Sequence, residues 1–129
     1  MTRTVVFVCE HGAFRSRIAA AYFNVAAAPG WRALSAGREP QAEASPRLGP
    51  LLAGTGAAEH LETAAAPGVE AVRADRLIAI DCAVEGAERW VTSAQSDHAL
   101  RDEIAGRVEG LVREIAAHAR RTRESESSR

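Results

Sequence analysis

The segment Thr4–Val8 constrains the fold of this chain more than any other part of the sequence. Its residues, Thr-Val-Val-Phe-Val, form a continuous apolar run that is rich in β-branched side chains. Such a run is typical of a strand that is buried on both faces of a parallel sheet. We therefore expect the chain to build a parallel β-sheet around this strand.

The segments that follow predict a helix and a second strand. Arg32–Ala36 reads as a strand closed by Gly37, and Pro29-Gly30 ends the helix before it. The apolar residues of that helix recur at the spacing of one helical face: Ile18, Ala21, Tyr22 and Val25. A strand, a helix and a strand with short links make a βαβ unit, which is right-handed almost without exception.

The stretch from residue 38 to residue 74 carries weaker patterns. Ser45-Pro46 predicts the start of a helix, although Gly49-Pro50 limits how regular that helix can be. We also predict a short strand at His60-Leu61 and a short helix from Gly68 to Asp75.

Two further strands and a long helix complete the predicted order of elements. Leu77–Ile80 reads as a buried strand that runs into Asp81-Cys82, and Arg89–Val91 reads as a brief last strand. The stripe of a long final helix consists of Leu100, Ile104, Val108, Leu111 and Ile115. No repeat or internal boundary is visible, so we predict a single α/β domain over residues 1–119. Residues 120–129 are rich in serine, glutamate and arginine, and we predict a disordered tail there.

Composition and charge narrow the class of protein. A chain of 129 residues, 47% of them hydrophobic, fits one domain with one core. A formal net charge of −1 gives no general attraction to nucleic acid or to an anionic membrane, and we expect neither as a partner. No apolar run approaches the ~20 residues that span a bilayer, and no secretory leader precedes the first strand. We therefore expect a cytoplasmic protein.

The chain has two cysteines, Cys9 and Cys82, and each follows a predicted strand. In a chain without an export signal, two cysteines are expected to be free, metal-bound or catalytic. No set of ligands with metal spacing accompanies them, so we predict neither a metal nor a cofactor. Parallel sheets bind ligands beyond the carboxyl ends of their strands, at the topological switch point. Both cysteines are thus placed where a site is expected.

The loop that begins at Cys9 is the candidate catalytic loop, because it joins the first strand to a helix that opens at Ser16-Arg17. Successive N–H groups of such a loop make a nest for a tetrahedral anion, and the helix dipole adds positive charge. Arg15 adds a bidentate clamp for the anion. The residues that we expect to form the oxyanion site are Glu10, His11, Gly12, Ala13, Phe14 and Arg15.

The same field stabilises a thiolate at Cys9. Ser16 is placed to donate a hydrogen bond to the sulfur and hold it ionised. A thiolate beneath a bound oxyanion is positioned for in-line attack on phosphorus or arsenic. The alternative is that Cys9 is an inert buried thiol at the end of a strand.

The run Val5–Phe23 resembles the opening of low-molecular-weight protein tyrosine phosphatases and thioredoxin-type arsenate reductases. Further similar segments follow in the expected order: Ser35-Ala36-Gly37, Asp81-Cys82, Trp90 and Leu100–Ile104. The resemblance implies a single flavodoxin-like α/β domain, a four-stranded parallel sheet with helices on both faces. It also implies Cys9 as nucleophile, Arg15 as oxyanion clamp and Ser16 as stabiliser of the thiolate.

Two positions depart from the pattern of this superfamily. Gly12 stands where the family usually has asparagine. Glycine reaches a positive φ without cost but holds it less firmly, so we expect a less preorganised loop. Ala94 stands where the family usually has its general acid, an aspartate before proline. A missing general acid costs ~10²–10⁴-fold in rate when the leaving group must be protonated.

Three other residues are candidates for the role of the missing acid. Asp97 is the nearest, and its alternative role is a cap or first-turn acid of the final helix, beside Ser96. Glu10 would repel a bound anion unless its side chain turns outward. His11 is expected to face solvent at the mouth of the loop, where it can exchange protons near neutral pH.

Cys82 determines which redox chemistry is open to the chain. Arsenate reductases of this family pass oxidation to a second cysteine, which Cys82 matches, and then to a third, which this chain lacks. A disulfide between Cys9 and Cys82 would be reduced directly by thioredoxin or by a low-molecular-weight thiol. The alternative for Cys82 is a small apolar core residue.

These residues predict an oxyanion enzyme with a cysteine nucleophile. Beyond Phe14 and Trp90, no aromatic residue lies after Trp31 to form the walls that stack on a phosphotyrosyl ring, so a small oxyanion suits the site better. Cys82, the missing walls and the missing aspartate favour arsenate reductase-like chemistry over hydrolysis of phosphomonoesters by a low-molecular-weight phosphatase. A third hypothesis is a non-catalytic pseudophosphatase that binds oxyanions.

Overall fold

Four parallel strands form one sheet in the computed structural model, which describes residues 1–26 and 28–127. The strands are β1 (Arg3–Cys9), β2 (Trp31–Gly37), β3 (Arg76–Ile80) and β4 (Glu88–Trp90), and they lie in the order β2-β1-β3-β4. β1 is flanked by β2 and β3 on its two sides, and its residues Val5–Val8 are each 0% exposed. The continuous apolar run is therefore the central strand, as predicted.

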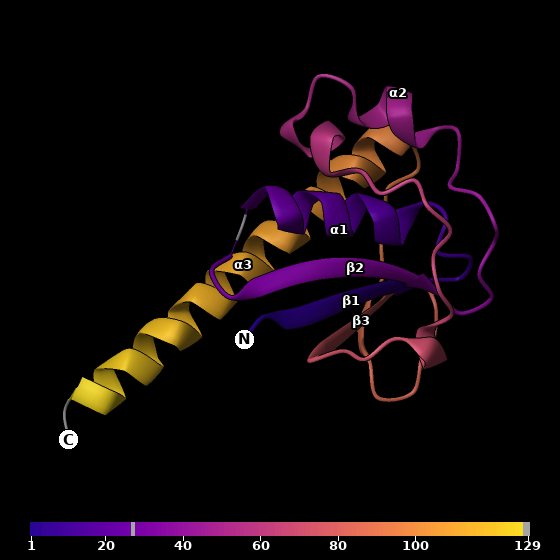
Figure 1. Ribbon diagram of the computed structural model, residues 1–129. Helices are drawn as coiled ribbons and strands as arrows, with labels where there is room; N and C mark the ends of the chain where they lie inside the picture. Colours follow the sequence, from indigo (N-terminus) through magenta and orange to yellow (C-terminus); the bar gives the residue numbers. More distant parts are fainter. Residues whose placement is uncertain (27, 128–129) are drawn as a thin grey trace.

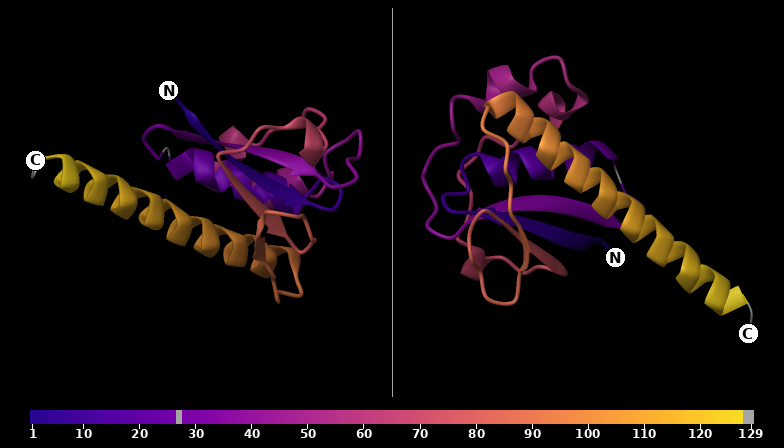
Figure 2. Two further views of the ribbon diagram at one scale, coloured as in Figure 1. Left: turned by 90° about the horizontal axis from the view of Figure 1, so that it is seen from below. Right: turned by 180° about the vertical axis from the view of Figure 1, so that it is seen from behind.

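Two long helices, α1 (Arg15–Ala26) and α3 (Asp97–Ser127), pack on one face of the sheet (Figures 1 and 2). Phe7 anchors this face, with its ring centroid 6.2 Å from that of Phe23 and 5.7 Å from that of Trp90. The other face has a smaller apolar cluster, which residues around the short 3₁₀ helix η2 (Val69–Ala71) cover. The predicted fold class is confirmed, with the second face covered by a single short helix and its flanking loops.

The segment between β2 and β3 differs from the prediction. It contains α2 (Leu48–Leu52) and a 3₁₀ helix, η1 (Gly56–His60), so His60 does not begin a strand. The helix predicted from Gly68 to Asp75 shortens to the three residues of η2. Packing against α1 fixes the conformation of this segment, because Leu52 and Ala57 are buried against Ala21. The local sequence pattern does not predict this conformation.

The predicted disordered tail is helical as far as the structure describes it. α3 continues to Ser127, and its last turns project beyond the sheet (Figure 1). The polar composition of residues 120–127 excludes a buried face, and they are all exposed, but extending an existing helix needs no such face. Residues 128 and 129 lie outside the described residues. Among those described, no helix combines the length and the apolarity that crossing a bilayer requires.

The carboxyl end of β1 lies at the switch point of the sheet. The chain leaves β1 through α1 to reach β2 on one side, and it later returns to β3 on the other side of β1. The strand order therefore reverses at β1, with β2 on one side and β3 on the other. Open parallel sheets bind ligands beyond the carboxyl end of the strand where this reversal occurs. The loop that begins at Cys9 lies there.

Candidate active site

Hydrogen bonds to carbonyl oxygens hold the catalytic loop in shape. Segment 38–45 donates them from its backbone N–H groups: Arg38 to Cys9 at 3.0 Å, Glu39 to Glu10 at 2.7 Å, Gln41 to His11 at 3.0 Å and Ser45 to Ala13 at 2.9 Å. By contrast, the N–H groups of residues 10–14 donate to no other residue that the structure describes. Successive free N–H groups at the start of a helix are what an anion nest requires.

Gly12 occupies the left-handed conformation expected of it, with a φ of 61°. It also lies so close to β2 that an added Cβ would be 2.8 Å from the nitrogen of Gly37 and 2.9 Å from the carbonyl carbon of Ala36. Gly37 has a matching constraint, because a Cβ there would be 2.8 Å from the carbonyl carbon of His11. The loop therefore rests on the end of β2 through two glycines, and asparagine at position 12 would not fit without a shift.

Cys9 and Ser16 meet inside this loop. Cys9 is 6% exposed, and its Sγ lies 3.2 Å from Oγ of Ser16, which is fully buried. The backbone N–H of Ser16 also donates to Sγ at 3.5 Å. Two groups from the first turn of α1, the hydroxyl and the backbone N–H of Ser16, thus contact the sulfur.

Arg15 pairs with Asp81, a contact that sequence reasoning did not find. Nε of Arg15 lies 2.9 Å from Oδ2 of Asp81, although the angle is too poor for a hydrogen bond. Asp81 follows β3 with a φ of 55°, and its carboxylate accepts from the backbone N–H of Thr92 at 2.8 Å and from the Thr92 hydroxyl. Arg15 remains 42% exposed in its side chain, so Asp81 restrains one end of a guanidinium that still faces solvent.

Arg17 is a second arginine at the site, and only the structure reveals its role. Its side chain is 1% exposed, and Nε donates to the carbonyl of Gly12 at 2.7 Å. Nη1 donates to the carbonyls of Glu62 and Ala64, each at 2.7 Å. Burial lowers the pKa of the Arg17 guanidinium, and the nearby Glu62 and Cys9 partly oppose this effect. Arg17 therefore joins the loop to segment 62–64, in a role that its local sequence does not reveal.

The side chains of Glu10 and His11 turn away from the loop interior. The Glu10 carboxylate accepts two hydrogen bonds of 3.0 Å from Arg38, which lower its pKa. Nδ1 of His11 lies 3.0 Å from the carbonyl oxygen of Glu39, with the side chain exposed. The outward turn that an anion at the loop requires of Glu10 is thus present.

The aromatic residues near the loop are buried. Phe14 and Trp90 are each 7% exposed, and the guanidinium of Arg47 covers the Phe14 ring at 4.1 Å. Ala13 is buried beside Phe14. Neither ring stands as an open wall beside Cys9.

Cys82 packs beside the end of β1. It is 6% exposed, belongs to the apolar cluster on the second face of the sheet, and donates its thiol to the carbonyl of Val8 at 3.7 Å. Burial raises the pKa of the Cys82 thiol, and the neighbouring Cys9 and Glu10 raise it further. Cys82 is therefore a protonated thiol near neutral pH, and it contacts the residue that precedes the candidate nucleophile in the sequence.

The segment between β4 and α3 brings no carboxylate of its own to the loop. Ala94 packs partly against the core, and its N–H donates to Glu103 at 3.0 Å. Asp97 is in the first turn of α3 and pairs with Arg47 at 2.8 Å, without a hydrogen bond or ion pair to residues 9–16. Ser96 accepts from Ala99 at 3.1 Å, as an N-cap does.

The groups left free at the loop favour an anion. In the part of the chain that the structure describes, no three His, Cys, Asp or Glu side chains come together as a metal-binding group. The free groups are the backbone N–H groups of residues 10–14 and the exposed end of Arg15. All of them donate hydrogen bonds, so the geometry suits a tetrahedral oxyanion.

The chain is similar to known proteins in its three-dimensional structure. No family model and no curated protein matches the chain. The arsenate reductase from Archaeoglobus fulgidus is 28% identical and has a TM-score of 0.67, with 84% of this chain and 98% of that chain covered. The thioredoxin-dependent arsenate reductase Cg_ArsC1' from Corynebacterium glutamicum is 22% identical, with a TM-score of 0.66 over 91% of this chain. This chain spans only 63% of the length of that enzyme.

A phosphatase has the same fold. The low-molecular-weight protein tyrosine phosphatase from T. tengcongensis is 16% identical, with a TM-score of 0.63 over 88% of this chain and 99% of that chain. Arsenate reductases and phosphatases of this type therefore both superimpose on nearly the whole described chain. The chain has the fold of the superfamily that comprises low-molecular-weight protein tyrosine phosphatases and arsenate reductases of this type.

Proposed function

We propose that the chain is an enzyme in which the Cys9 thiolate attacks a tetrahedral oxyanion held by the loop from Cys9 to Arg15, and that it acts as an arsenate reductase. The observation that supports this most directly is the contact of Cys9 Sγ with both the hydroxyl and the N–H group of Ser16, beneath a run of free backbone N–H groups. A sulfur with these neighbours is a nucleophile beside an anion site.

In the first step, the Cys9 thiolate forms a sulfur–arsenic bond. One arsenic–oxygen bond breaks, and the hydroxyl group leaves as water after it takes up one proton. The free N–H groups of residues 10–14 and the guanidinium of Arg15 hold the remaining oxygens. Their positive ends stabilise the charge that develops on those oxygens.

In the second step, Cys82 resolves the adduct. Its thiol loses a proton, and its sulfur attacks Cys9 Sγ, so that a disulfide forms as the sulfur–arsenic bond breaks. The electron pair stays on arsenic, which is reduced from As(V) to As(III) and leaves as arsenite. The two thiols are oxidised to a disulfide, which thioredoxin, or two molecules of a small thiol, then reduces. The position of Cys82 beside Val8, next in sequence to Cys9, supports this role.

Hydrolysis of phosphomonoesters through a cysteinyl-phosphate is the second candidate function. The observation that favours it is the burial of Cys82, whose raised pKa and apolar neighbours also suit an inert core residue. In this case Cys82 is dispensable, and the leaving group must find its proton without an aspartate at position 94. Such a phosphatase favours substrates whose leaving group needs no protonation.

The test compares two activities in four proteins. Reduction of arsenate with thioredoxin, and separately with a small thiol, is measured beside hydrolysis of an aryl phosphate. The variants are Cys9→Ser, Cys82→Ser and Cys82→Ala, with the unmodified chain as reference. The two substitutions at Cys82 separate loss of the thiol from a change in packing, since serine keeps a polar group and alanine keeps an apolar one.

We expect arsenate reduction that disappears in Cys9→Ser and falls at least ~100-fold in both Cys82 variants with thioredoxin as reductant. Intact arsenate reduction in both Cys82 variants would contradict the second step and leave a small thiol as the group that attacks the adduct. Aryl phosphate hydrolysis without arsenate reduction would establish the phosphatase. If neither activity exceeds that of Cys9→Ser, the chain is a pseudophosphatase that only binds the anion.

A further inference from the structure

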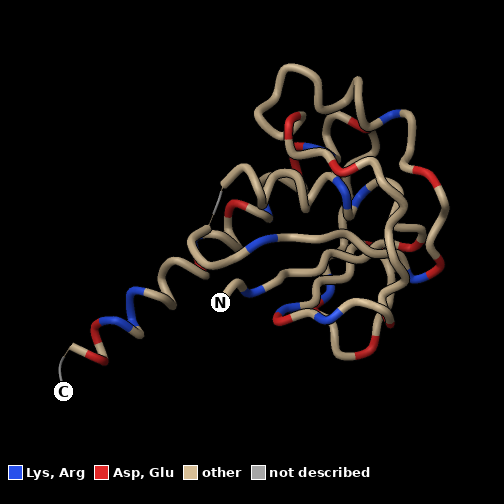
Figure 3. The backbone as a smooth tube through the Cα atoms, viewed as in Figure 1, with Lys and Arg blue, Asp and Glu red and all other residues tan. Residues whose placement is uncertain are grey.

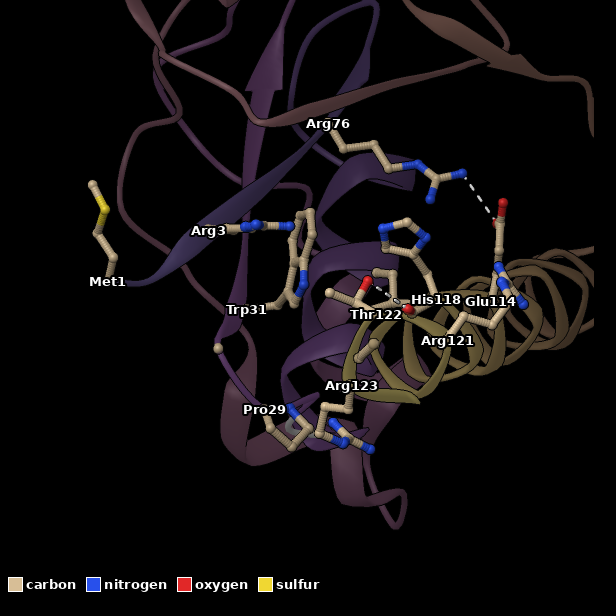
Figure 4. Close-up of a pocket in the computed structure, with 13 residues that line it drawn as sticks. Met1, Arg3, Pro29, Trp31, Arg76, Glu114, His118, Arg121, Thr122 and Arg123 are labelled. Atoms are coloured by element: carbon tan, nitrogen blue, oxygen red, sulfur yellow. Dashed lines mark hydrogen bonds and ion pairs between the residues drawn. The ribbon is translucent and has the colours of Figure 1, made fainter. Parts of the chain in front are cut away.

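A second cavity lies at the opposite edge of the sheet from the catalytic loop. It has a volume of about 700 Å³ and lies between the amino ends of β1 and β2 and the last turns of α3 (Figure 4). Arg3 and Cys9 are the two ends of β1, and a strand rises about 3.3 Å per residue, so the two sites are about 20 Å apart. A cavity of this volume is large enough for a small organic ligand.

The lining of the cavity carries an excess of positive charge. Arg3, Arg121 and Arg123 line it, and none of them makes an ion pair with another residue that the structure describes. The single lining carboxylate, Glu114, is already paired with Arg76 at 3.1 Å. These basic positions lie at the start of β1 and near the end of α3 (Figure 3). Three unpaired guanidinium groups around one cavity favour a ligand with at least two negative charges.

Trp31 adds a flat apolar surface to this basic cavity. Its ring is half-buried, and the guanidinium of Arg3 lies 5.8 Å from its centroid. Figure 4 shows His118 and Thr122 of α3 across the cavity from Trp31. The Thr122 hydroxyl is engaged with the carbonyl of His118 at 3.0 Å, so the polar contacts open to a ligand are mainly those of the arginines. An indole beside free guanidinium groups suits a ligand in which a planar ring carries phosphates.

We propose that this cavity is a binding site for a small aromatic polyanion of the nucleoside diphosphate class, separate from the catalytic loop. The ring stacks against Trp31, and the phosphates pair with Arg123 of α3 and Arg3 of β1. Arg121 is two positions from Arg123, so it faces another side of the helix and adds positive charge on the Glu114 side of the cavity. The proposal needs no catalysis at Cys9, so it stands or falls independently of the proposed function.

The test is calorimetric titration of the full chain with ADP and with inorganic pyrophosphate. All titrations use the Arg15→Ala background, which removes the side-chain clamp of the catalytic loop and so limits binding of the probes there. The test variant is Arg121→Gln with Arg123→Gln. Its matched control is Arg113→Gln with Arg120→Gln, since both residues lie on exposed parts of α3, outside the cavity lining, and the loss of charge is the same.

We expect ADP to bind with a dissociation constant at least about tenfold weaker in the test variant than in the control. Trp31→Ala should weaken binding of ADP and leave binding of pyrophosphate unchanged, with helical circular dichroism verifying the fold. Equal affinity for ADP in the test and control variants, or no binding of ADP at all, would overturn the proposal. Equal effects of Trp31→Ala on both probes would overturn the role assigned to the ring.

Discussion

Gly12 and Gly37 approach each other so closely that the catalytic loop rests directly on the end of β2. The φ of 61° at Gly12 disfavours most side chains, and the 2.8 Å that would separate its Cβ from Gly37 disfavours any side chain at all. The two constraints are separable, because Gly30 also has a positive φ, of 80°, with nothing within 4 Å of its Cβ position. The chain thus contains its own control for the effect of backbone conformation alone.

Gly12→Ala should lower the free energy of unfolding more than Gly30→Ala does. A left-handed alanine costs about 1–2 kcal/mol at either position. At position 12 the contact with Gly37 adds to this cost, and the loop must also shift, so we expect weaker binding of phosphate. Urea unfolding and phosphate titration of both variants measure the two effects. Equal losses of stability would show that the loop absorbs the extra methyl group.

Cys82 should make stability depend on pH in the alkaline range. Burial raises the pKa of the Cys82 thiol above the ordinary value of about 8.5, so the folded chain holds a proton that the unfolded chain releases. The resulting stabilisation is complete below about pH 8.5 and is lost as pH rises through the higher pKa of the folded state. Urea unfolding under reducing conditions between pH 7.5 and pH 10 should therefore show a steeper decline for the unmodified chain than for Cys82→Ala. Parallel declines would contradict this account.

At the scale of elements, two connections hold the site together. Arg17 of α1 bonds to the carbonyls of Gly12 and of segment 62–64, so that one buried side chain joins the loop, the helix and the connection to β3. The segment between β4 and α3 is fixed in a similar way, since Asp81 holds Thr92 and Glu103 holds the N–H groups of Ser93 and Ala94. Both connections use charged groups to satisfy backbone groups that local structure leaves unpaired.

Arg17→Met should destabilise the chain by about 3 kcal/mol, because it leaves the buried carbonyl oxygen of Gly12 and the part-buried carbonyl oxygens of Glu62 and Ala64 without their charged donor. Arg113→Met, on the exposed side of α3, is the control and should change the free energy of unfolding by less than about 0.5 kcal/mol. Chemical denaturation measures both values. A loss of less than about 1 kcal/mol for Arg17→Met would mean that water replaces the guanidinium.

Ala94→Asp should raise phosphatase activity by supplying a general acid where the superfamily usually has one. The expected gain in kcat is about 10–100-fold for phenyl phosphate, whose leaving group needs a proton, and smaller for p-nitrophenyl phosphate, whose leaving group does not. Ala94→Asn is the matched control and should give no gain. Equal gains on the two substrates would show that the aspartate acts through structure instead of through proton transfer.

At the scale of the whole molecule, the catalytic loop and the basic cavity lie at opposite ends of the sheet. The catalytic loop lies at the carboxyl end of β1, and the basic cavity lies at its amino end, where the last turns of α3 project past the body (Figure 2). Residues 120–127 are exposed along their whole length and contribute little to the core. The end of α3 therefore contributes more to the lining of the cavity than to the hydrophobic core.

Truncation after residue 119 should separate these roles. We expect the free energy of unfolding to fall by less than about 1 kcal/mol, because the removed residues bury no apolar side chain. Activity at Cys9 should be unchanged, and binding of ADP should be lost together with Arg121 and Arg123. A large loss of stability would show that the end of α3 supports the core from a distance.

Much of the fold was predictable from the sequence because its pattern is local. The continuous apolar runs Val5–Val8 and Leu77–Ile80 predict buried strands, and the periodic apolar stripe of α3 predicts a helix. Each element lies where its pattern predicts. The region from Gly56 to Asp75 was not predictable in this way. Its short helices are held by packing against α1 and the sheet, and their alanine-rich sequence has no period of its own.

The sequence by itself determined the main strands and long helices along the chain and the residues of the candidate loop, from Cys9 to Ser16. Only the tertiary structure decided that Arg15 faces Asp81, that Glu10 turns outward to Arg38, and that Arg17 is buried beneath Gly12. The physical reason is that periodicity and turn chemistry act between neighbours in sequence, whereas ion pairs and close glycine contacts depend on segments that meet only at the edge of the folded sheet.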